Sequence, residues 1–168
     1  PLTLEEIYKR MGVKIGVNCK IQFGVIIDYS HYWHIEIGDN VTIAPNVHIL
    51  SHDASTYHRF GYTKIGKVLI QDNVFIGAGS IILPGVIIGE NSIIGAGSIV
   101  KKDVPPNSVF TGNPAKLVCT VDDYYLKIES EFNKYPLFSD DYTLRGNISN
   151  KKKEEMNHKM IERYGFVK

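Results

Sequence analysis

The segment from Ile70 to Val100 reads IQDNVFIGAGSIILPGVIIGENSIIGAGSIV and repeats every six residues. An isoleucine or valine anchor occupies the same place in each repeat: Ile70, Ile76, Ile82, Ile88, Ile94 and Val100. Six is not a multiple of the 3.6-residue helical turn, so these side chains would not share one helix face. The same spacing occurs earlier in two shorter series: Ile15, Ile21, Ile27 and Ile37, Ile43, Ile49.

Two other positions of the repeat are also restricted. Three residues after an anchor stands Asn or Gly, the residues that adopt positive φ at least cost: Asn18, Gly24, Asn40, Asn46, Asn73, Gly79, Gly85, Asn91 and Gly97. Four residues after an anchor stands a small or β-branched residue: Val41, Val47, Val74, Ser80, Val86, Ser92 and Ser98. Each unit therefore predicts a short strand followed by a corner.

Three such units would close a triangular coil. Coils stacked at roughly 4.8 Å form a parallel β-helix with the isoleucines inside, so the predicted fold class is all-β. The alternative is an ordinary sandwich of short strands, which does not keep a six-residue register over this length.

The composition excludes several classes of protein. The chain has 168 residues and a net charge of +1, so no overall field favours nucleic acid or an anionic membrane. Its apolar runs are too short for membrane insertion, and Pro1–Lys20 lacks the apolar core of a signal peptide. Two cysteines argue against a disulfide framework. We expect a cytoplasmic protein.

The repeat sets the expected domains. Thr3 and Glu6 match a capping box, which predicts an N-terminal helix in residues 1–12. The β-helix domain would cover 13–118, with an excursion loop at 52–69. The repeat is absent from 119–168, where two helical segments predict a C-terminal helical extension.

The excursion begins at a histidine. Three residues after Ile49 the register requires Asn or Gly, but the residue is His52. A loop that leaves a rigid scaffold is a common place for function, and histidine suits a general base near neutral pH. The alternative is an ordinary surface histidine. His31 and His34 lie in a second, shorter interruption and could flank the same cleft.

The repeat and the segment IAPNVHILSHDAST, Ile43–Thr56, resemble the hexapeptide-repeat acyltransferases, above all the sugar, maltose and galactoside O-acetyltransferases and the xenobiotic acetyltransferases. The resemblance implies a left-handed β-helix, a hand that the spacing does not show and that opposes the usual crossover rule. It also implies acetyl-CoA as the donor, no metal, and His52 as the catalytic base in a ternary complex.

The resemblance further implies which residues hold the donor. Small residues in FIGAGS and IIGAGS would leave room for a pantetheine arm. The implied cofactor-binding residues are Phe75, Ala78, Ala96, Lys101, Lys102 and Lys116. The chain departs from the family at Phe75, where relatives often have Trp, and at Cys119, where they often have Arg.

For the acceptor, the implied substrate-binding residues are Gln22, Asp28 and Asp53. Asp53 directly follows His52 and could orient that base or bind a sugar hydroxyl. The nearby aromatic side chains could stack on a sugar ring or cover the prism: Tyr29, Tyr32 and Trp33.

The expected function is transfer of an acetyl group from acetyl-CoA to a saccharide hydroxyl. The alternatives are N-acetylation of an amino sugar or nucleotide amino sugar, a zinc protein like the gamma-class carbonic anhydrases, and a catalytically silent scaffold. The zinc alternative would use His52 and His58 with a third ligand from His31, His34 or His48, but no histidine occurs between Ile70 and the C-terminal tail. Apolar residues beside the anchors predict a homotrimer with sites between subunits, as in related enzymes.

Overall fold

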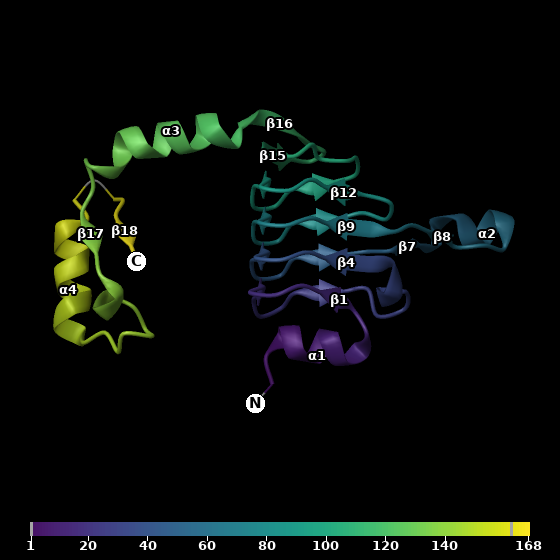
Figure 1. The fold of residues 1–168 in the computed structure, drawn as a ribbon, viewed down its shortest axis with the longest axis horizontal. Coiled ribbons are helices and arrows are strands. Elements are labelled where there is room, and N and C mark those ends of the chain that lie inside the picture. Colours follow the sequence, from purple (N-terminus) through teal and green to yellow (C-terminus); the bar gives the residue numbers. More distant parts are fainter. Residues whose placement is uncertain (1, 162) are drawn as a thin grey trace. The chain divides into compact units, whose positions relative to one another are not determined.

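The computed structural model describes residues 2–161 and 163–168. The chain divides into two compact units, with the boundary between Asp122 and Asp123. The first unit is a stack of triangular coils, drawn in purple to green in Figure 1. The second is a small unit of helices and two short strands.

Three parallel sheets form the sides of the first unit. The first sheet has the order β1 (Lys14–Ile15), β4 (Ile35–Ile37), β9 (Val68–Ile70), β12 (Ile87–Ile88). The second sheet has the order β2 (Lys20–Ile21), β5 (Thr42–Ile43), β10 (Phe75–Ile76), β13 (Ile93–Ile94), β15 (Ser108–Gly112), β16 (Ala115–Thr120). The third sheet has the order β3 (Ile26–Ile27), β6 (His48–Ile49), β11 (Ile81–Ile82), β14 (Ile99–Val100). Successive strands of the chain visit the sheets in turn, which confirms the predicted parallel β-helix.

The anchors of the repeat fill the interior. Several are fully buried at 0 % exposure: Ile43, Ile49, Ile76, Ile82, Ile88 and Ile94. The small residues four positions after the anchors are buried beside them: Val41, Val47, Val74, Ser80, Val86, Ser92 and Ser98. Each isoleucine contributes about 1.5–3 kcal/mol by leaving water, so the six-residue period is also the period of the core.

The corners have the predicted backbone conformation. All nine Asn and Gly corners have φ between 54° and 87°. Along the corner between the first and second sheets the asparagine side chains also form a ladder, in which each amide donates to the next at 3.0–3.3 Å: Asn18, Asn40, Asn73, Asn91 and Asn107. The asparagines thus supply both the positive φ and hydrogen bonds between successive coils.

Each end of the prism is covered. The helix α1 (Leu4–Met11) has the predicted capping box between Thr3 and Glu6. Its Tyr8 hydroxyl donates to the carbonyl of Val25 at 2.9 Å, which holds the helix against the first coil. At the other end β15 and β16 pair antiparallel, with Val109 opposite Cys119. Cys119 and Thr120, which the sequence analysis assigned to the extension 119–168, therefore belong to this hairpin.

Two interruptions leave the prism at the same corner, between the third and first sheets. The first follows β3 and contains a single 3₁₀ turn, η1 (Tyr32–His34). The second follows β6 and is a hairpin of β7 (His52–Asp53) and β8 (Lys64–Ile65), tipped by η2 (Ala54–Thr56) and α2 (Tyr57–Phe60). Because β9 begins at Val68, the predicted excursion 52–69 ends two residues too late.

The second unit contains more than the predicted helices. Its helices are α3 (Val121–Phe132), whose first two residues belong to the first unit, and α4 (Asn150–Lys159), with the 3₁₀ turn η3 (Asp140–Tyr142) between them. The short strands β17 (Leu137–Phe138) and β18 (Phe166–Val167) also form a parallel pair. Within the described residues, each helix is too short or too polar for a transmembrane span.

Candidate active site

His52 lies where the second interruption leaves the prism, and its side chain is 32 % exposed. Its Nδ1 is 2.5 Å from Oδ2 of Asp28. Asp28 directly follows β3, and β3 pairs with β6 so that Ile27 lies beside Ile49. The stacking of coils therefore brings together two residues that are 24 positions apart in the sequence.

The carboxylate of Asp28 is buried, with a side-chain exposure of 1 %. Its Oδ2 also accepts hydrogen bonds from the backbone N–H of Ser51 at 2.9 Å and the Ser51 hydroxyl at 3.0 Å. Its Oδ1 accepts from the N–H of Ser30 at 2.9 Å. Burial opposes ionisation, but the hydrogen bonds from His52, Ser51 and Ser30 outweigh it and hold the pKa of Asp28 well below its usual value.

The ionised Asp28 determines the tautomer of His52. A carboxylate only accepts hydrogen bonds, so Nδ1 of His52 carries a proton. The lone pair of the neutral ring is then on Nε2, the nitrogen away from Asp28. A histidine held in this way by a buried carboxylate has the arrangement of a general base and its orienting partner.

A hollow of about 550 Å³ opens beside His52. Its other lining residues are Leu50, Asp53, Ala54, Lys64, Leu83, Pro84 and Lys101. The volume is typical of a small-molecule site. Lys64 and Lys101 add positive charge, which suits an anionic ligand such as a phosphate-bearing cofactor. Of the predicted cofactor-binding residues, Lys101 alone lines this hollow.

The other predicted donor residues lie elsewhere in the chain. Ala78 and Ala96 are exposed on the corner between the second and third sheets, where the carbonyl of Ala78 accepts from the N–H of Gly97 at 2.8 Å. Phe75, on β10, is also exposed and does not line the hollow beside His52. The same holds for Gln22, which was predicted to bind the acceptor. Lys102, next to Lys101 in the chain, is exposed, and so is Lys116, which lies on β16. A single chain therefore does not gather the predicted donor set around His52.

The structure gives the two predicted aspartates, Asp28 and Asp53, different surroundings. Asp28 was assigned to the acceptor, but its carboxylate is buried and faces His52. The carboxylate of Asp53 accepts from the N–H of Ser55 at 2.9 Å and caps η2, so it does not orient His52. Asp53 does line the hollow, and its role in binding the substrate stays a prediction. Sequence reasoning missed the partner of His52, although the 22-residue register of Ile27 and Ile49 is a signal that could have found it.

The aromatic residues of the first interruption separate into two groups. Tyr32 packs against the core and so covers the prism. Tyr29 and Trp33 are exposed, by 77 % and 55 %. The Trp33 ring lies 5.3 Å from that of His31, which in turn lies 5.5 Å from that of His52. Trp33 is thus an exposed aromatic ring beside His31, whereas Tyr32 packs on the core.

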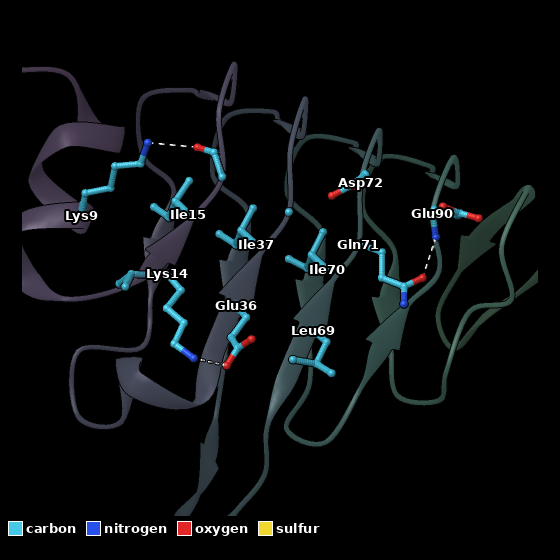
Figure 2. Close-up of a pocket in the computed structure, with 13 residues that line it drawn as sticks. Lys9, Lys14, Ile15, Glu36, Ile37, Leu69, Ile70, Gln71, Asp72 and Glu90 are labelled. Carbon is cyan, nitrogen blue, oxygen red and sulfur yellow. Dashed lines mark hydrogen bonds and ion pairs between the residues drawn. The ribbon is translucent and has the colours of Figure 1, made fainter.

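A larger hollow, of about 900 Å³, lies on the first sheet beside α1. Figure 2 shows Lys14 and Glu36 side by side on the neighbouring strands β1 and β4, joined by an ion pair of 2.7 Å. Gln71 accepts from the N–H of Glu90 at 3.0 Å at the other end. Among the described residues that line it, none is a histidine, serine, threonine or cysteine. The hollow beside His52, which has a histidine in its lining, is therefore the better candidate for a catalytic site.

Sequence comparison finds two matches to family models. Residues 67–102 match the bacterial transferase hexapeptide (six repeats), and residues 7–29 match the hexapeptide repeat of succinyl-transferase. The chain is also 40 % identical over 168 residues to the protein CapG of Staphylococcus aureus, covering 95 % of this chain and 91 % of that one. This alignment is longer than the first unit and so extends into the second. Of several further curated relatives the chain spans between 44 % and 63 % of the length.

Two of the solved structures that are similar to the chain are acetyltransferases at 34 % identity. A maltose O-acetyltransferase from Clostridium difficile is 34 % identical, with a TM-score of 0.56, covering 69 % of this chain and 73 % of that one. A galactoside acetyltransferase in complex with coenzyme A is also 34 % identical, with a TM-score of 0.56, covering 71 % and 70 %. The period, the fold and these likenesses agree: the chain belongs to the hexapeptide-repeat acyltransferases, a left-handed parallel β-helix family, and is an acetyl-CoA-dependent member of it.

Proposed function

We propose that the chain transfers an acetyl group from acetyl-CoA to a hydroxyl of a saccharide, with His52 as the general base. The observation that carries the proposal is the His52–Asp28 pair at the edge of a hollow of cofactor size. The similarity to maltose and galactoside acetyltransferases supports the saccharide as the acceptor class.

The mechanism follows from the tautomer of His52. Nε2 takes the proton of the acceptor hydroxyl as its oxygen attacks the thioester carbonyl of acetyl-CoA. Asp28 stabilises the imidazolium that forms, and a backbone N–H stabilises the oxyanion of the tetrahedral intermediate. The intermediate collapses by breaking the C–S bond, and the imidazolium returns its proton to the departing thiolate. The products are the acetyl ester and coenzyme A.

We infer a homotrimer in which the donor lies between two copies. Ala78 and Ala96 lie on a different corner of the prism from His52, so they can reach that base only from a neighbouring copy. The outward side chains of the third sheet support such a contact, because they form one row in register. Along this row the order is Ile26, His48, Ile81, Ile99. A cyclic assembly would bury this row.

An acceptor screen tests the proposal. The purified chain is incubated with acetyl-CoA and a panel of saccharides, amino sugars and nucleotide sugars, and released thiol is measured. We expect thiol release that depends on a saccharide bearing a free hydroxyl, with a product that mild base cleaves as an ester. A base-stable amide formed only with amino sugars would replace the proposal by N-acetylation. A cytoplasmic location stays a prediction.

A further inference from the structure

One group of potential metal ligands stands out among residues 2–161 and 163–168. Asp28, His31 and His52 each offer one ligand atom, and these atoms all lie within 4.8 Å of one another. The proposed reaction uses Asp28 and His52 but leaves the ring of His31 without a role. This ring lies 5.5 Å from that of His52, between centroids.

His31 is held in place by its surroundings. Its ring stacks on that of His34, with centroids 6.1 Å apart and planes at 8°. Its backbone carbonyl accepts from the Ser51 hydroxyl at 3.0 Å, which ties it to the residue that also binds Asp28. Its Nδ1 is shielded from solvent and has no hydrogen-bond partner among the described residues. A buried polar atom without a partner costs about 1–3 kcal/mol, so a bound ion that this nitrogen ligates would remove that cost.

We propose that Asp28, His31 and His52 bind a divalent transition-metal ion, and that the bound ion blocks the catalytic base. One carboxylate and two imidazoles, with a fourth position open, form a ligand set typical of zinc. The exposed part of His52 gives the ion a path from the adjacent hollow. The site is distinct from the three-histidine site considered from the sequence, since His58 and His48 are outside the group.

Metal binding and catalysis exclude each other geometrically. Two ligands of one zinc ion, with bonds of about 2.1 Å at tetrahedral angles, are separated by roughly 3.4 Å. Nδ1 of His52 and Oδ2 of Asp28 are only 2.5 Å apart. An ion that takes Nδ1 of His52 and Oδ2 of Asp28 as ligands can therefore enter only when the His52 ring moves and the hydrogen bond to Asp28 is broken. Zn²⁺ should accordingly inhibit the enzyme by removing the base from its orienting partner.

Isothermal titration calorimetry of the full chain with ZnCl₂ tests the site without depending on any acceptor. We compare the natural chain with His31→Gln and Asp28→Asn, and use His58→Ala as the matched control on the exposed helix α2. We expect one Zn²⁺ per chain, with affinity reduced by at least about tenfold in His31→Gln and Asp28→Asn, since each loses a ligand. His58→Ala should bind like the natural chain.

Two further measurements separate the loss of a metal ligand from misfolding of the variant. Circular dichroism melts identify folded variants, and Co²⁺ added to the natural chain should produce a visible d–d band that His31→Gln lacks. Equal Zn²⁺ affinity in folded His31→Gln, or no one-to-one binding by the natural chain, would overturn the proposal. These readouts are independent of acetyl transfer, so their failure differs from failure of the proposed function.

Discussion

Replacing Asp28 by Asn tests the orienting role of this residue. The exchange keeps the shape of the side chain but removes the charge that faces Nδ1 of His52 at 2.5 Å. The amide has one oxygen for four donors, which come from His52, Ser51 and Ser30. Its NH₂ group must then face at least one N–H, so the orientation of His52 is weakened or its tautomer reversed.

The size of the effect follows from the hydrogen bonds that change. A hydrogen bond to a charged group contributes about 1.5–3 kcal/mol. Because each 1.4 kcal/mol in the barrier is a factor of ten, losing this stabilisation of the imidazolium lowers kcat by roughly 10–150-fold. The KM for acetyl-CoA should stay near that of the natural chain, since Asp28 does not line the hollow.

Steady-state release of thiol from acetyl-CoA, at saturating acceptor, measures both constants. The matched control is Asp72→Asn, which removes a carboxylate that accepts from the N–H of Asp39 at 2.8 Å on a different corner. The control should keep its kcat. A folded Asp28→Asn variant whose kcat lies within about threefold of the natural chain would refute the orienting role.

Three further predictions concern stability and assembly. Asn73→Val forces a β-branched residue to φ 57° and breaks the asparagine ladder, so thermal denaturation should show a loss of about 1–3 kcal/mol in the free energy of unfolding. Asn73→Gly should lose less stability. If both variants melt like the natural chain, the corner geometry is contradicted. The pKa of Asp28 is lower in the folded state, so its contribution to stability is present above the unfolded value of about 3.9 and is lost as pH falls below that value. The difference in melting temperature between the natural chain and Asp28→Asn should therefore shrink below about pH 4. A constant difference would disprove this linkage. Light scattering should show a trimer, and His52→Ala chains mixed with Ala96→Tyr chains should regain part of the activity; an active monomer of 18.9 kDa would rule out shared sites.

The sequence predicted the prism well because one short rule governs each coil. The anchors from Ile27 to Val100, such as Ile76, are buried by the same geometry, and every Asn or Gly corner, such as Asn73, has a positive φ, so the pattern and the fold have one period. The end hairpin of β15 and β16 and the pair of β17 and β18 lack such a period. Two-residue strands like Leu137–Phe138 carry no local pattern, since their pairing depends on residues far along the chain.

The candidate site was only half visible from the sequence. His52 stood out because it broke the register after Ile49. Asp28 was noticed, but its role depends on which coil stacks on which, and that is a property of the assembled prism. The hydrogen bonds of Ser51 and Ser30 that keep Asp28 ionised depend on the same stacking.

The turnover of His52→Ala tests the central claim most directly. Thiol release with a verified saccharide acceptor is measured for the natural chain and the variant, and acetyl-CoA affinity is measured separately by calorimetry. The account predicts that turnover falls by roughly 10²–10⁴-fold, as for the loss of a general base, while the affinity for acetyl-CoA changes little. Turnover close to that of the natural chain in a folded His52→Ala variant would contradict it.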